Sequence, residues 1–154
     1  MEKKMKIKLW ISFLLLASVL MAFACSKKKE FSGEYRGEAT AKLEPNYPNS
    51  PLIAEAKNQD AVATVKQDGD NVTLEVSNSD ILKNCQLKGK VNPNGKVYVS
   101  GSTCDVSVSG VARSAYFSEG SVSLGETDGS LTIELTGLAG TGERFKYKFQ
   151  GKKK

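Results

Sequence analysis

Residues 33–43 read GEYRGEATAKL, and small or apolar residues alternate there with charged or polar ones. Tyr35 and Leu43 fall on one parity with the two alanines, whereas Arg36 and Lys42 fall on the other. A period of two places each set of side chains on its own face of a β-strand. The stretch therefore predicts a strand with one buried face.

The same alternation recurs along the chain between turn signals such as Asp-Gly and Asn-Gly. Residues 106–110 either continue the predicted strand at 97–99 or form a separate strand. We therefore predict an all-β domain, a single antiparallel up-and-down β-barrel of about eight strands. The predicted strands cover 33–43, 61–65, 72–76, 85–91, 97–99, 106–110, 116–124, 131–135 and 145–149.

Residues 44–60 form the longest predicted connection and are rich in Asn and Pro in their first half. Ser50 can cap and Pro51 can start a short helix over 52–56. A connection without a helix is an equal alternative. A second turn, 68–71, has the oxygen-bearing sequence Asp-Gly-Asp-Asn, which favours a hairpin turn over a calcium site because the further ligands of a calcium loop are missing.

Residues 92–95, Asn-Pro-Asn-Gly, predict a hairpin turn in which proline sets the first central position and glycine takes a positive φ. A three-residue loop of this kind pairs Asn92 with Lys96 and sets Val91 against Val97. In this register the residue numbers of each pair add up to 188.

Cys85 and Cys104 miss each other by one residue in that register, because Cys85 faces Thr103. The apolar parity also changes from odd to even near this point. One β-bulge near 101–102 accounts for both facts, since it moves the sum to 189 and sets Cys104 opposite Cys85. We expect a disulfide that stabilises the fold by about 3 kcal/mol. The absence of C-x-x-C spacing disfavours a redox or metal site.

Composition limits the function. The 154 residues carry a formal charge of +5, but residues 30–151 hold 12 Lys and Arg against 16 Asp and Glu, a net charge of −4. This sign disfavours nucleic acid as a partner. The chain has no histidine, which excludes Ser-His-Asp and Cys-His catalysis and the usual imidazole metal sites. We expect no enzyme activity, no cofactor and no metal site.

Residues 1–24 combine a basic start, an uncharged apolar run and the small-residue end Ala22-Phe23-Ala24. This pattern is typical of a secretory signal peptide, and the run is short for a membrane-spanning helix. Cys25, which follows, resembles the lipobox cysteine of bacterial lipoproteins, which is diacylated, with chains such as palmitate, and N-acylated. The resemblance implies lipidation of Cys25, and Ser26 then implies the outer membrane. Cleavage by a non-lipid signal peptidase at the same bond is the alternative.

The predicted organisation is a signal peptide at 1–24, a lipidated tether at 25–32, a barrel at 33–151 and a basic tail at 152–154. With an even number of strands the chain enters and leaves the barrel at one end. The lysine triplets at 27–29 and 152–154 would then lie together beside the membrane. They either bind anionic headgroups or only keep the ends soluble.

The opening Gly33-x-Tyr35-x-Gly37 and the closing Phe149-x-Gly151 resemble the lipocalin-like or calycin-like barrels of bacterial envelope lipoproteins, with tyrosine in place of the lipocalin tryptophan. The resemblance implies a binding or envelope protein on the periplasmic or surface side. We expect a small apolar ligand or lipid inside the barrel. The alternative is a protein-interaction module, such as a hydrolase inhibitor or an envelope scaffold, that uses 44–60 and 112–117.

The inward parity is rich in small residues, which either permit strand coiling or leave room for a ligand: Gly37, Ala39, Ala41, Ala61, Ala63, Gly89 and Gly110.

Overall fold

The structure is a computed structural model that describes residues 29–154 apart from 48–49, 78, 84, 100 and 141. The predicted signal peptide and Cys25 lie outside these residues. No helix in the described part is long and apolar enough to cross a membrane. The strands are β1 (Gly33–Glu44), β2 (Ala54–Asp68), β3 (Asn71–Ser77), β4 (Leu82–Lys83), β5 (Gln86–Val91), β6 (Val97–Val99), β7 (Ser102–Val108), β8 (Val111–Leu124), β9 (Leu131–Ala139) and β10 (Glu143–Lys153).

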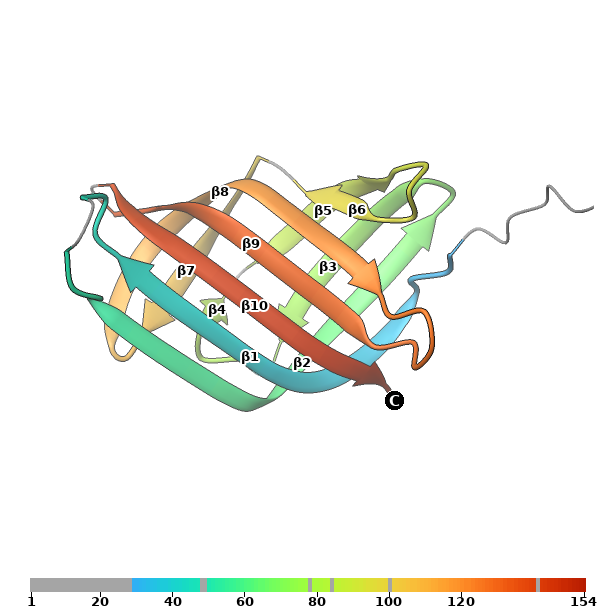
Figure 1. Cartoon of the computed structure of the whole chain (residues 1–154), viewed down its shortest axis with the longest axis horizontal. Coiled ribbons are helices and arrows are strands. Elements are labelled where there is room, and N and C mark those ends of the chain that lie inside the picture. Colours follow the sequence, from blue (N-terminus) through green and yellow to red (C-terminus); the bar gives the residue numbers. More distant parts are fainter. Residues whose placement is uncertain (1–28, 48–49, 78, 84, 100, 141) are drawn as a thin grey trace, which may run out of the picture.

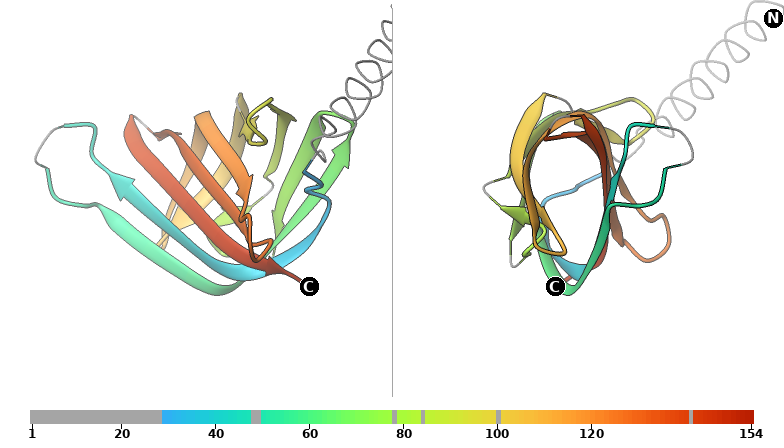
Figure 2. Two further views of the ribbon diagram at one scale, coloured as in Figure 1. Left: turned by 45° about the vertical axis from the view of Figure 1, so that its right-hand side comes forward. Right: turned by 90° about the vertical axis from the view of Figure 1, so that its left-hand side faces the viewer.

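Eight of these strands close into a ring, in the order β1, β2, β3, β5, β6, β8, β9 and β10, with β10 paired to β1 (Figure 1). The right-hand view of Figure 2 shows this ring end-on. The other two strands extend the sheet, since β7 pairs with the first half of β8 and β4 pairs with β7. The pairs are antiparallel, and ring neighbours follow the chain order. The predicted up-and-down barrel of about eight strands is confirmed.

The first connection differs from its prediction. Strand β2 begins at Ala54 and pairs with β1 as far as Leu43 opposite Ala54, so the predicted helix at 52–56 is wrong and the connection is shorter than 44–60. The alternation continues here, with Glu55 and Lys57 exposed and Ala56 packed against the core. A helix of five residues gains too few hydrogen bonds to offset its nucleation, whereas strand pairing with β1 satisfies the backbone.

The hairpin of β5 and β6 has the predicted register. Val91 lies opposite Val97, the Asn92 N–H donates to the Lys96 carbonyl over 2.8 Å, and Gly95 has φ of 72°. Strands β4 and β7, which precede β5 and follow β6 along the chain, pair in the same register. Leu82 lies opposite Val106, and these residue numbers again add up to 188.

The predicted shift of the pair sum to 189 therefore holds at Cys85 and Cys104 but does not continue beyond them. The irregularity near Gly101, which has φ of 71°, is present, but the partner strand carries a matching slip between the inward-facing Leu82 and Cys85. The irregularities in the two strands offset each other, so the pair sum returns to 188 between β4 and β7. The predicted disulfide is confirmed between Cys85 and Cys104, whose Cα atoms lie 4.8 Å apart at this double break.

The two ends of the barrel differ in what they carry. The chain enters and leaves at one end, where Tyr35 pairs with Lys153 and the Lys154 N–H donates to the Glu34 carbonyl over 3.0 Å. We call this the tether end. At the opposite end, the far end, lie the connection from β1 to β2 and the turns from β7 to β8 and from β9 to β10 (Figure 2).

Candidate functional site

The interior of the barrel is filled by its own side chains. Each residue of the core cluster exposes at most 5% of its surface, and no polar or charged residue of the described part is buried. A cavity that holds a ligand exposes the residues that line it, so these side chains leave no ligand-sized space beside them. The three aromatic residues near the C-terminus, Phe145, Tyr147 and Phe149, belong to this core. The largest fully buried side chains are Phe31, Tyr35, Phe117, Phe145, Tyr147 and Phe149.

Two of the small inward residues, Ala39 and Ala41, lie opposite large ones, whereas Gly37 lies opposite Gly151 and Gly110, expected on the inward face, is exposed in the turn after β7. Ala39 pairs with Phe149, and Ala41 pairs with Tyr147, across β1 and β10. A Cβ atom on Gly151 would lie 2.5 Å from the Phe149 ring, so the ring occupies the space that a side chain there would need. Aromatic rings of β10 thus lie opposite Ala39 and Ala41 and take the room beside Gly151.

Two tyrosine hydroxyls enter this apolar interior, and they differ in their partners. The Tyr35 hydroxyl donates a hydrogen bond to the Phe31 carbonyl over 3.0 Å. This bond helps to hold Phe31 in the core, where the residue is buried, although it was predicted to belong to the tether. The Tyr147 hydroxyl is buried without a hydrogen-bond partner in the described structure. Burial raises the pKa of Tyr147 far above its usual value, because the charged phenolate would lose its hydration.

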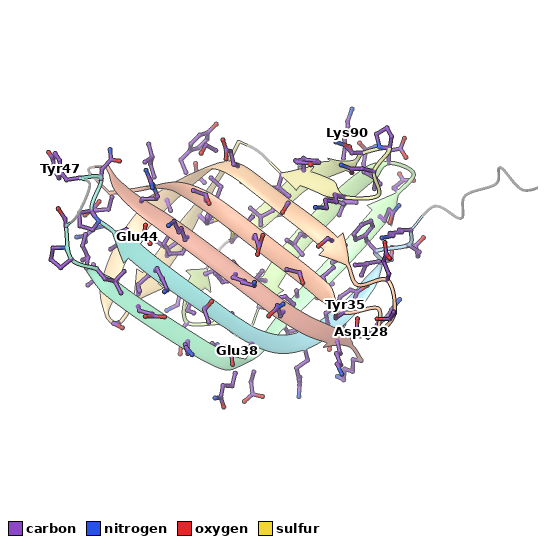
Figure 3. The ribbon with its side chains drawn as sticks, in the orientation of Figure 1. Tyr35, Glu38, Glu44, Tyr47, Lys90 and Asp128 are labelled. Atoms are coloured by element: carbon purple, nitrogen blue, oxygen red, sulfur yellow. A yellow bond between two sulfur atoms is a disulfide. The ribbon has the colours of Figure 1, made fainter. Side chains whose placement is uncertain are left out.

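The far end carries a hollow of about 450 Å³ between the β1–β2 connection and the start of β10. Glu44 and Arg144 supply opposite charges on its wall, and Tyr47 and Leu52 supply apolar surface. Tyr47 exposes 77% of its surface and Leu52 exposes 44%. Figure 3 shows Tyr47 at the tip of this connection, above Glu44.

The outer face beside this hollow is also apolar. Tyr116 on β8 lies opposite Leu138 on β9, which in turn lies opposite Arg144 on β10. Tyr116 and Leu138 each expose 52% of their surface. Arg144 thus joins this pair to the hollow. We call Tyr47, Leu52, Ile53, Tyr116 and Leu138 the far-end surface; they are five of the six large apolar side chains that the described part exposes.

Two further hollows lie on the outside of the barrel. One, of about 430 Å³, lies over β6, β8 and β9 and is lined by Tyr98, Glu119 and Glu134 among others. The other, of about 500 Å³, lies beside β3 and β4 and includes Glu75 and Leu82. In the described residues no group of three or more His, Cys, Asp or Glu side chains is arranged to hold a metal ion.

The predicted interaction segments correspond only in part to the far-end surface. The connection after β1 does present Tyr47 and Leu52, but 112–117 is no loop: it lies inside β8, and only Tyr116 presents a large apolar side chain there. Leu138 lies outside both predicted interaction segments. Its position on the outward parity of β9, with Glu134 and Thr136, was the available signal.

No family model, no curated protein and no solved structure matches this chain.

Proposed function

We propose that this chain is a lipid-anchored protein of the bacterial envelope that binds a protein partner through the far-end surface, without catalysing a reaction. The observation that carries the proposal is the concentration of exposed apolar side chains at one end of a barrel whose interior is filled. Single exposed apolar residues are normal on protein surfaces, but a group beside a hollow is typical of an interaction site.

The composition of the far-end surface suits a protein partner. Tyrosine and arginine are the residues that most often dominate binding energy, and Tyr47, Tyr116 and Arg144 lie within this surface or on its hollow. The neighbouring ion pair between Glu44 and Lys146, with 2.8 Å between oxygen and nitrogen, supplies a polar rim.

The anchor supports the same arrangement. Acylation of Cys25 would hold the tether end at the membrane, since several acyl chains on one residue give stable attachment. The far-end surface lies at the opposite end of the barrel, where a partner can approach it (Figure 2).

Photo-crosslinking in intact cells tests this proposal. A photoreactive amino acid at Leu138 should give a discrete crosslinked band, and Tyr47→Ser together with Tyr116→Ser should abolish it. The same amino acid at Glu75, an exposed position on β3, is the control and should give no such band. A band of equal strength from both positions, or a band that ignores the two substitutions, contradicts the proposal.

A second candidate function is the binding of a small apolar molecule or lipid inside the barrel. It is favoured by the unpartnered hydroxyl of Tyr147, which a polar group of a ligand can satisfy once the packed side chains around it move apart. Displacement of a fluorescent fatty acid tests it: binding that weakens in Tyr147→Phe supports an interior site, and no binding to either protein rejects it.

A further inference from the structure

The hairpin of β5 and β6 carries several lysines and no acidic residue of its own. Residues 86–99 contain Lys88, Lys90 and Lys96 and no Asp or Glu. All three lysines are exposed. Lys66 on β2 lies in the same outer row as Lys88, with Thr73 between them. Two acidic residues, Asp68 at the end of β2 and Asp70 in the turn after it, lie near these lysines. Glu119 and Glu134 line the hollow beside Tyr98, and Glu134 forms an ion pair with Lys148.

An exposed aromatic ring lies within this basic hairpin. Tyr98 is opposite Lys90 and exposes 51% of its surface. It is the one large apolar side chain exposed in the described part that lies outside the far-end surface. Tyrosine beside lysine is the combination found where proteins meet the headgroup region of a membrane.

Residues 29–32, the first described residues, lie beside this hairpin at the tether end (Figure 1). The Lys29 Cδ lies 3.4 Å from the position that a Cβ atom on Gly95 would occupy, so Lys29 contacts the turn between β5 and β6. Cys25 precedes Lys29 by only four residues, which reach about 14 Å when extended. An anchor at Cys25 would therefore enter the membrane close to this turn.

The C-terminal lysines, in contrast, face carboxylates. Lys154 forms an ion pair with Glu34 over 3.3 Å. Hydrogen bonds from Ser32 lower the pKa of Glu30, and the charge of Lys153 adds to that shift. Lys152 acts in the same way on Asp128, after the hydrogen bonds from Ser130. Each of the three C-terminal lysines thus has a carboxylate near it, and Lys154 forms an ion pair.

We propose that the hairpin of β5 and β6, and not the C-terminal lysines, lies on the membrane and binds anionic lipid headgroups through Lys88, Lys90 and Lys96. This inference rests on the lipid anchor of the proposed function. Tyr98 then lies at headgroup level, and the face formed by β1 and β10, across the ring, points away from the lipid.

Vesicle sedimentation of residues 26–154 tests the inference without the acyl chains, because every strand lies between residues 33 and 153 and the ring closes among them. The vesicles are phosphatidylcholine with or without phosphatidylglycerol. Each lysine near an anionic surface strengthens partition about fivefold, so Lys88→Gln, Lys90→Gln and Lys96→Gln together should weaken it by up to about 100-fold. Lys42→Gln, Lys146→Gln and Lys148→Gln remove the same charge from β1 and β10 and should have little effect.

Tyr98→Trp gives a second readout. Trp10 lies in the signal segment, so this substitution creates the single tryptophan of residues 26–154. Its fluorescence emission should shift to shorter wavelength with anionic vesicles, while a Tyr116→Trp control should not shift.

Equal loss of binding in both lysine variants, or no preference of the parent protein for anionic vesicles, overturns the inference. Acylation of Cys25, measured separately by palmitate labelling, tests the anchor itself.

Discussion

Removal of the hydroxyl of Tyr147 should stabilise the barrel. The side chain exposes only 2% of its surface, and its hydroxyl has no hydrogen-bond partner in the described structure. A buried polar group without a partner costs about 1–3 kcal/mol relative to water, and phenylalanine keeps the ring packed against Ala41 without that cost. For a domain of this size, each kcal/mol corresponds to roughly 3–5 °C in Tm.

The pH dependence gives the prediction a second test. Burial raises the folded-state pKa of Tyr147 above that of the unfolded chain, which is about 10. The neutral hydroxyl therefore stabilises the fold relative to the phenolate, and this contribution is complete below about pH 10 and is lost as pH rises beyond it. The advantage of Tyr147→Phe in free energy of unfolding should thus grow above about pH 10.

Urea unfolding at neutral and alkaline pH measures both effects, with Tyr35→Phe as the matched control. The Tyr35 hydroxyl has a partner, the Phe31 carbonyl, so its removal should destabilise the fold by about 0.5–1.5 kcal/mol. Opposite signs for the two substitutions are expected. Destabilisation by Tyr147→Phe at neutral pH would refute the reasoning, because it would mean that the hydroxyl is satisfied, for example by a bound ligand.

Three further predictions concern the anchor, the disulfide and the packing. Cys25→Ala should move the protein from the detergent phase to the aqueous phase in phase partitioning, and palmitate labelling that persists in this variant would contradict the anchor. Cys85→Ser and Cys104→Ser should each lower the free energy of unfolding by about 3 kcal/mol. The double variant should be no less stable than either single one, since one bond is lost only once; additive losses in thermal unfolding would show that the thiols act separately. Gly151→Ala should cost about 1–3 kcal/mol in urea unfolding, because the new Cβ atom would meet the Phe149 ring, whereas Gln150→Ala on the exposed face should change little; equal effects would contradict the packing.

The alternation along β1 and the Asn-Pro-Asn-Gly turn were sufficient to predict strands, barrel type and one hairpin register, since each depends on neighbours in sequence. The start of β2 was not predictable in this way. The alternating segment Ala54-Glu55-Ala56-Lys57 suits a strand only because β1 offers a pairing edge there. The slip between Leu82 and Cys85 was hidden for a similar reason, because too few residues precede it in β4 to reveal a change of parity.

The nature of the interior depends on contacts between the two ends of the chain. Whether Ala39 and Ala41 leave room for a ligand is decided by the residues opposite them, and these are Phe149 and Tyr147 of the last strand. The sequence contains both sets of residues, but it does not show that they pair. The parity of β9 indicates that Leu138 points outward, but its place beside Tyr116 and Arg144 follows from strand pairs that the sequence does not show.

Native mass spectrometry of residues 26–154, exported to the envelope of a bacterial host and purified from it without added ligand, tests the filled barrel most directly. The account predicts the mass of the polypeptide with one disulfide and no bound small molecule. An additional apolar molecule that is retained in the folded state and released on unfolding would contradict it, and would place the function of this protein inside the barrel.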